Sequence, residues 1–258
     1  MNIFGDEADF SLFISDLHLC HTRPAITALF IEFLQSKATQ ANSLYILGDL
    51  FEYWAGDDDI DDPHHRQVIN AIKALSANIP VYFIHGNRDF LISQSFADAA
   101  NISLLANPTL LEAYGKRILI SHGDELCTDD LAYQTFRTQV RNPAWQQQFL
   151  AQPLSSRKSQ IEALRLRSET EKSQKSEVIM DVNDLSVQAL FKAYAYPDLL
   201  IHGHTHRPAK HLLEIDGHHC ERWVLGDWYD QGSCLKLNEY GCSNVVLHPQ
   251  QFSQSADK

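Results

Sequence analysis

Three histidines at alternate positions follow a short apolar run late in the chain. In LLIHGHTHRP (199–208) the run leads into His202, His204 and His206. Apolar runs of this length are typical of buried strands, so these imidazoles stand where the chain leaves its core. They are either a polar strand end in water or metal ligands, and a metal would need further ligands from elsewhere in the sequence.

Such ligands stand at the ends of four other apolar runs. The runs are SLFISDLH (11–18), SLYILGDL (43–50), VYFIHGNRD (81–89) and RILISHGD (117–124), and their ends carry Asp16, His18, Asp49, Asn87 and His122. Loops at the carboxyl ends of strands converge on one crevice in α/β sheets. Carboxylate, imidazole and amide groups are suitable ligands for manganese, iron or zinc ions. The absence of thiolates argues against a structural zinc site, which usually contains cysteine ligands. Each motif alone has an ordinary structural interpretation, such as a turn for Asn87, but all five in this order favour metal.

The order of the motifs carries a resemblance. D-x-H (16–18), G-D (48–49), G-N (86–87), H-G (122–123) and G-H-x-H (203–206) together resemble the calcineurin-like metallophosphoesterase superfamily over about residues 11–210. The resemblance implies a four-layer α/β/β/α sandwich and two divalent cations that share one carboxylate, as in two-metal phosphate chemistry. By position it implies that one cation is held by Asp16, His18, Asp49 and His206, and the other by Asp49, Asn87, His122 and His204. His202 lies outside the last motif, and we expect it to be structural.

Arg88 departs from a common pattern of the superfamily. Many members have a histidine after the G-N pair, assigned as the acid for the leaving group, whereas this chain has GNRDF (86–90). A guanidinium is a poor proton donor but a good bidentate clamp for phosphate. We therefore expect a leaving group that needs little protonation, such as the second phosphate of a diphosphate. The expected catalytic residues are Asp49, Arg88 and His122. Asp89, His85 and Asp124 are expected to orient ligands, with a structural role equally open for the last two.

Longer stretches narrow the resemblance. YILGDLFEYWAGDDD (45–59), YFIHGNRDFL (82–91), SHGDELCTDD (121–130), SEVIMDVN (176–183) and IHGHTHRPA (201–209) are similar to the pyrophosphohydrolases that cleave UDP-2,3-diacylglucosamine in lipid A biosynthesis. This similarity implies attack of a metal-bound hydroxide on the α-phosphorus, giving UMP and 2,3-diacylglucosamine 1-phosphate (lipid X). It also implies Mn²⁺ as the cation and peripheral contact with the cytoplasmic face of the inner membrane. The alternatives are a phosphoesterase for a soluble phosphodiester or nucleotide and a low-turnover metal-binding scaffold.

The elements that position these residues alternate between strands and helices. Helical patterns at 25–35 and 64–76 separate the early strands, which predicts an α/β protein with crossover units. The later part (WVLGDW, SCLKL and NVVLH) is strand-rich and suggests a second sheet. Two packed sheets with helices outside fit best, although one large mixed sheet is also compatible with the periodicity. We expect a phosphoesterase core over 1–124 and 196–250, a helical insertion or cap over 125–195, and a flexible tail at 251–258.

The insertion carries a basic excess. Residues 141–175 contain seven Lys or Arg and three acidic residues, on a chain of formal charge −12. Four side chains of this segment are spaced by three, four and three residues and therefore share one helix face. They are Arg165, Ser168, Lys172 and Lys175. Such a face could simply be exposed to water. The anionic substrate implied by the resemblance favours a role of this face in substrate binding. The resemblance adds further candidates, so the expected substrate-binding residues are Asn87, Arg88, Asp130, Tyr133, Arg165, Ser168, Lys172, Lys175 and His204. Trp145, Phe149, Leu150 and Leu154 either shelter acyl chains or pack the cap onto the body.

Bulk properties exclude several classes of protein. The charge of −12 argues against a general nucleic-acid binder. No apolar stretch approaches the roughly 20 residues that span a bilayer, and the acidic start MNIFGDEADF does not resemble a secretion signal. The five cysteines form no C-x-x-C pair, so we expect reduced thiols in the cytoplasm.

Overall fold

A computed structural model describes residues 9–172 and 181–248. One sheet has the strand order β11-β10-β1-β2-β3-β4. Its four N-terminal strands run parallel, and β10 pairs antiparallel with both β1 and β11. Its strands are β1 (Phe10–Ile14), β2 (Ser43–Ile46), β3 (Val81–Phe83), β4 (Ser103–Leu104), β10 (Gly232–Asn238) and β11 (Gly241–Leu247).

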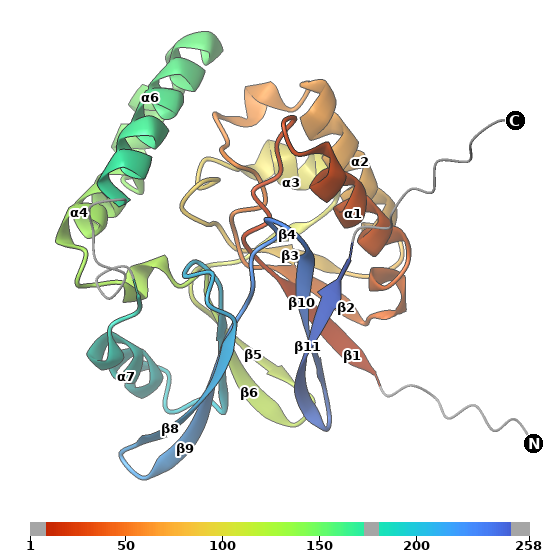
Figure 1. Ribbon diagram of the computed structural model, residues 1–258, viewed down its shortest axis with the longest axis vertical. Coiled ribbons are helices and arrows are strands. Elements are labelled where there is room, and N and C mark those ends of the chain that lie inside the picture. Colours follow the sequence, from red (N-terminus) through yellow and green to blue (C-terminus); the bar gives the residue numbers. More distant parts are fainter. Residues whose placement is uncertain (1–8, 173–180, 249–258) are drawn as a thin grey trace, which may run out of the picture.

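The second sheet has the order β5-β6-β7-β9-β8. Strands β6, β7 and β9 are parallel, and the outer strands β5 and β8 are antiparallel to their neighbours. Its strands are β5 (Thr109–Ala113), β6 (Lys116–Ile120), β7 (Leu199–His202), β8 (Ala209–Ile215) and β9 (His218–Val224). The two sheets lie face to face (Figure 1).

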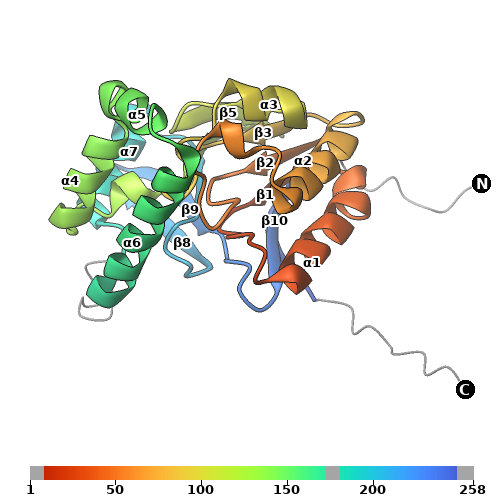
Figure 2. The ribbon, with the colours of Figure 1, turned by 90° about the horizontal axis from the view of Figure 1, so that it is seen from above.

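Helices cover the outer faces of both sheets. The three N-terminal helices lie beside the first sheet, and α7 (Asp184–Ala193) covers the outer face of the second sheet (Figure 2). In the described part of the chain, the other helices between β6 and β7 do not cover that face. Asp62, Asn142 and Asn183 cap three of the helices by accepting hydrogen bonds from first-turn amides. The helices are α1 (Pro24–Gln35), α2 (Pro63–Ser76), α3 (Gln94–Ala100), α4 (Leu131–Val140), α5 (Pro143–Leu150), α6 (Leu154–Lys172) and α7 (Asp184–Ala193).

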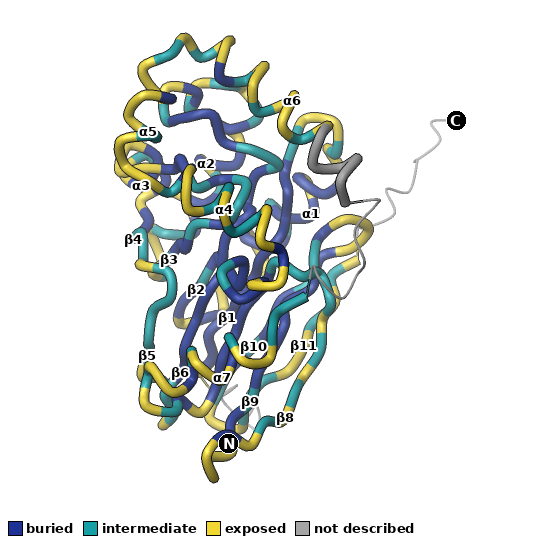
Figure 3. The backbone as a smooth tube through the Cα atoms, turned by 90° about the vertical axis from the view of Figure 1, so that its left-hand side faces the viewer, coloured by how far each residue is buried: buried dark blue, intermediate teal, exposed yellow. Residues whose placement is uncertain are grey.

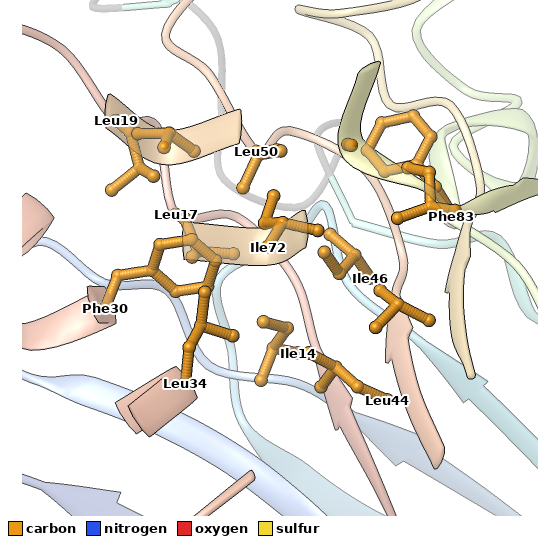
Figure 4. Packing of buried hydrophobic residues seen from close by; sticks show 14 of the residues in the cluster. Ile14, Leu17, Leu19, Phe30, Leu34, Leu44, Ile46, Leu50, Ile72 and Phe83 are labelled. Atoms are coloured by element: carbon orange, nitrogen blue, oxygen red, sulfur yellow. The ribbon is translucent and has the colours of Figure 1, made fainter. Parts of the chain in front are cut away.

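Three apolar clusters separate four layers. Successive strand residues face opposite sides of a sheet, so Leu12 of β1 packs in the cluster beneath α1–α3, whereas Phe13 packs between the sheets. Leu200 of β7 joins Val187 and Phe191 of α7 in a third cluster outside the second sheet. Figure 4 shows part of the first cluster. In Figure 3 the central strands such as β1 are buried, whereas the outer strands β8 and β11 are partly exposed. The predicted α/β/β/α sandwich is confirmed.

One detail of the predicted fold was wrong. The late strands β10 and β11 extend the first sheet, because β10 pairs with β1 in the register Phe10↔Asn238. The second sheet is instead built from β5–β9. Periodicity identifies a strand but not its partner, which explains the error. The short elements α3, β4 and β5 were not predicted.

The predicted insertion contains two kinds of helix. α7 forms the fourth layer on the second sheet, whereas α5 and α6 pack against the first cluster through Phe149, Trp145 and Ile161. For Trp145 and Phe149 the packing interpretation therefore holds, and Leu150 stays part-exposed. The division at 125 and 195 remains a prediction. Among residues 9–172 and 181–248, no helix combines the length and apolarity needed to cross a bilayer.

Candidate metal centre

Backbone strain gathers where the expected ligands leave the strands. Asp16, His18, Asp49, His204 and His206 all have left-handed backbone conformations, with φ between 49° and 69°. This region is unfavourable for residues other than glycine, and it persists only where the surroundings enforce it. These turns bring side chains from the loops after β1, β2 and β7 to the same edge of the two sheets.

One group of ligands consists of Asp16, His18 and His206, whose ligand atoms lie within 4.8 Å of one another. The Nε2 atoms of the two histidines are 3.2 Å apart, and His206 Nε2 is 3.3 Å from Asp16 Oδ1. Asp16 Oδ2 accepts a hydrogen bond from the amide of His204, which ties this loop to the last motif. Two imidazole nitrogens and a carboxylate oxygen thus face one point.

The second group surrounds Asn87. Its Oδ1 lies 3.0 Å from His122 Nε2 and 2.8 Å from His204 Nδ1. Asp49 lies beside them, with Oδ1 3.8 Å from His122 Nε2 and Oδ2 3.9 Å from His18 Nδ1. The Asp49 carboxylate therefore lies between the two groups, where a shared ligand would have to be.

The electrostatics of these groups fit cations. Asp16 Oδ1 and His18 Nδ1 are buried without a hydrogen-bond partner in the described structure, and such orphaned groups are costly unless an ion satisfies them. Burial raises the pKa of Asp49 to about 7, with Asp89 and Asp16 adding to the rise. His122 Nδ1 lies 2.8 Å from the Leu47 carbonyl oxygen, which leaves Nε2 as the ligand atom of the neutral ring. The residues present fit two divalent cations.

Glycines allow the loops to approach closely. A Cβ atom at Gly86 would lie 2.1 Å from Asp49 Oδ1, and one at Gly203 would lie 2.3 Å from Asp16 Oδ2. Both contacts are shorter than any side chain permits. The glycines of the G-N and G-H-x-H motifs are therefore required for the carboxylates to reach their places.

The residues expected to orient ligands act on the loops. Asp89 accepts hydrogen bonds from the amides of Leu50 and Gly86, and so joins the loops that carry Asp49 and Asn87. His85 Nε2 lies 2.7 Å from the carbonyl oxygen of Ile92 in its own loop.

Two buried groups near the centre serve the surrounding structure. Asp124 accepts hydrogen bonds from Tyr133 Oη and Arg137 Nε of α4. His202 Nε2 lies 3.1 Å from Arg222 Nη1, and burial, with Arg222, lowers its pKa to about 4. These contacts agree with the structural interpretation of His202.

Some of the predicted substrate-binding residues lie beside the candidate metal centre, and others lie on helices α4 and α6. The Tyr133 ring centroid is 5.7 Å from that of His204, and Arg88 and Arg165 both reach Glu52. Asp130 caps α4 by accepting from the Tyr133 amide. Ser168 and Lys172 belong to the α6 backbone, but their side chains, and Lys175 entirely, lie outside the described residues.

Part of the basic excess has a different use from the one predicted. Arg157, which is buried, binds the Ala55 carbonyl and the Asp58 carboxylate, and Lys158 Nζ is 2.7 Å from Asp59 Oδ1. These cations fasten α6 to the loop that follows β2. They are therefore engaged within the protein.

The sequence interpretation missed four residues around the centre. Asp227 Oδ2 lies 3.4 Å from His206 Nδ1, and the Tyr229 ring stacks on His18 at 5.5 Å. Arg23 lies over Tyr229, and Glu52 faces Arg23 and His18. Asp227 follows β9 and Glu52 follows β2, so a search for polar residues just after strands, which gave the candidate ligands, could also have given both.

Comparison with known proteins agrees with this arrangement. Residues 11–208 match the family described as calcineurin-like phosphoesterase. A protein from Aromatoleum aromaticum is 52% identical over 90% of this chain and 94% of its own length. Relatives from Cellvibrio japonicus and Stenotrophomonas maltophilia are 49% and 48% identical, covering 90% and 92% of this chain and 96% and 98% of theirs. All three are named UDP-2,3-diacylglucosamine hydrolase. Among solved structures, an archaeal phosphodiesterase matches with a TM-score of 0.47 at 14% identity, covering 92% of this chain and 99% of its own.

Proposed function

The chain belongs to the calcineurin-like phosphoesterase family, and from that premise we propose that it hydrolyses the diphosphate of UDP-2,3-diacylglucosamine. The products are UMP and 2,3-diacylglucosamine 1-phosphate (lipid X), in lipid A biosynthesis. The observation that carries the proposal is the 52% identity to a relative named for this substrate over 90% of the chain. The unmatched tenth is too short to hold all of residues 125–195, so the similarity includes much of the helical segment as well as the metal centre.

The predicted ligand sets suit this reaction. Asp16, His18, Asp49 and His206 would hold one cation, and Asp49, Asn87, His122 and His204 the other. Divalent cations bound there supply Lewis acidity and lower the pKa of water, which is the chemistry that phosphate cleavage needs. The oxygen and nitrogen donors are compatible with Mn²⁺.

The protein's own groups bind and orient the diphosphate. Arg88 lies beside the centre, with its amide donating to Asp49 Oδ1, and its guanidinium suits the charge of the departing sugar phosphate. Attack at the phosphorus next to uridine leaves that sugar phosphate, which needs no proton from Arg88. Tyr133, Asp130 and the α6 residues Arg165, Ser168, Lys172 and Lys175 would bind the rest of the substrate.

The lipid part of the substrate places the reaction at a membrane surface. Two acyl chains keep the substrate in a bilayer, so we place the protein in peripheral contact with the cytoplasmic face of the inner membrane. Leu164 on α6 is exposed and could make such contact.

Mass spectrometry of the products formed in oxygen-18 water tests the reaction. Purified protein with Mn²⁺ should convert UDP-2,3-diacylglucosamine to UMP carrying the heavy oxygen and to unlabelled lipid X. Label in lipid X would overturn attack at the α-phosphorus. Cleavage of soluble diesters only, or no turnover on any phosphoester, would overturn the substrate or the enzyme assignment.

A further inference from the structure

Glu52 lies at the meeting point of four segments. It follows β2 by a few residues, and its part-buried carboxylate is 13% exposed. Its Oε1 accepts from Arg88 Nη1 at 3.2 Å and from Arg165 Nη2 at 2.5 Å. Its Oε2 faces Arg23 Nη2 at 3.8 Å and His18 Nδ1 at 3.9 Å. The carboxylate thus contacts the loop after β3, helix α6, the segment before α1 and the first metal-ligand group.

The charges around Glu52 do not balance. Three guanidinium groups face one carboxylate, so the cluster carries a formal excess of two positive charges. Arg88 and Arg165 share a single oxygen, and without the carboxylate between them the two cations would repel each other. Glu52 therefore holds together two cations that would otherwise separate.

Arg165 also has an unused donor. Its Nε–H is buried without a hydrogen-bond partner in the described structure, and its guanidinium lies 5.9 Å from the Tyr53 ring centroid. A buried unsatisfied donor is costly unless a ligand satisfies it. An anionic oxygen is the matching acceptor, because guanidinium groups bind phosphate through a planar set of donors.

We propose that Glu52 is a positioning residue that sets Arg88 and Arg165 side by side as a two-arginine clamp for the substrate's diphosphate. The proposal rests on the proposed function for the identity of that diphosphate. Through Arg165 the same carboxylate couples the placement of α6 to phosphate recognition. Glu52 touches no reacting atom and acts through the two arginines.

Glu52→Gln removes the charge and keeps the shape of the side chain. We expect kcat/KM for UDP-2,3-diacylglucosamine and the calorimetric affinity for UDP, with Mn²⁺ present, each to fall at least about tenfold. Mn²⁺ stoichiometry and Tm should stay as in the wild type. The matched control is Asp58→Asn, which loosens the same helix through Arg157 without touching Arg88. It should change both quantities less than about twofold.

The outcomes separate this proposal from the proposed function. If the wild type cleaves the lipid substrate and Glu52→Gln behaves like it, or Asp58→Asn loses as much, the clamp is wrong and the function stands. If UDP binding falls in Glu52→Gln but the wild type does not cleave the lipid, the function fails and the clamp stands.

A second measurement applies if Glu52→Gln does not fold or loses metal. A double-mutant cycle of Arg88→Lys and Arg165→Lys should give strongly non-additive losses in UDP affinity, because the two side chains share one partner. Additive losses would overturn the proposal.

Discussion

At the scale of single residues, the sequence shows which side chains could bind a metal but not their backbone conformations. Asp16, His18 and Asp49 were recognisable because carboxylates and imidazoles stood at the ends of apolar runs. Their left-handed conformations were not recognisable, because that strain is imposed by contacts such as the bond from the His204 amide to Asp16. Glu52 was overlooked since a single glutamate in a loop resembles any solvated acid until its arginine partners are known.

Asp49→Ala tests the shared ligand. Removing the carboxylate should lower kcat/KM by at least about 10³-fold, since metal ions contribute several kcal/mol of charge stabilisation. It should also weaken the binding of both cations in calorimetric titration. If the variant lost one cation and bound the other with full affinity, Asp49 would not be a shared ligand. The control is Asp61→Asn on the surface, which should leave activity and cation binding unchanged.

The affinity for Mn²⁺ should rise with pH. Burial lowers the pKa of His122, but Asp49 and Asp16 outweigh it and raise that pKa to about 9. Below pH 9 the ring of the metal-free protein is therefore protonated, and a cation must displace that proton to bind. His204 releases no proton when a cation binds, because burial and His122 lower its pKa to about 3 and the ring is already neutral. Between pH 7 and 9 the dissociation constant should fall by up to about tenfold per pH unit.

Calorimetry in two buffers of different ionisation enthalpy measures this proton release. At pH 7.5 the observed enthalpy of Mn²⁺ binding should depend on the buffer, with net release of protons. An enthalpy independent of the buffer would show that His122 is already neutral in the metal-free protein.

At the scale of helices and strands, burial on both faces explains what was predictable. β1, β2 and β7 lie between two layers, so they are continuous apolar runs that stand out in the sequence. Their partners were not predictable, and β10 was assigned to the wrong sheet. The use of α7 as the fourth layer was likewise hidden, because an amphipathic pattern does not say which surface it covers.

Arg157→Ala tests how α6 is held. The buried guanidinium binds the Ala55 carbonyl, the Gln152 carbonyl and Asp58. Its removal leaves the buried Ala55 carbonyl unsatisfied and opens a space in the core, so the free energy of unfolding should fall by about 2–3 kcal/mol. Urea denaturation measures the change. The control is Arg66→Ala, whose exposed pair with Asp61 should contribute less than about 1 kcal/mol. Equal losses in both variants would show that α6 does not depend on this anchor.

At the scale of the whole molecule, the candidate metal centre lies where the two sheets meet. Asp16 and Asp49 follow strands of the first sheet, and His122 and His204 follow strands of the second. Bound cations would therefore link the two central layers in addition to the apolar cluster between them.

Removal of metal should consequently lower the thermal stability. With Mn²⁺ at about 100 times its dissociation constant, a site that exists only in the folded state adds about 2.7 kcal/mol, or about 5–10 °C in Tm for a chain of this size. Scanning calorimetry with EDTA and with Mn²⁺ measures the difference. Asp49→Ala should show a much smaller shift, and a wild-type Tm that does not respond to Mn²⁺ would contradict the link.

The pairing of β1 with β10 has a consequence for synthesis on the ribosome. β1 acquires its antiparallel neighbour only when residues 232–238 emerge, so this edge of the first sheet stays open while the intervening residues are synthesised. The histidines of the last motif arrive almost as late. A nascent chain thus completes its first sheet and its set of candidate ligands nearly together, long after β1 has emerged, which makes folding of this protein a long-range event.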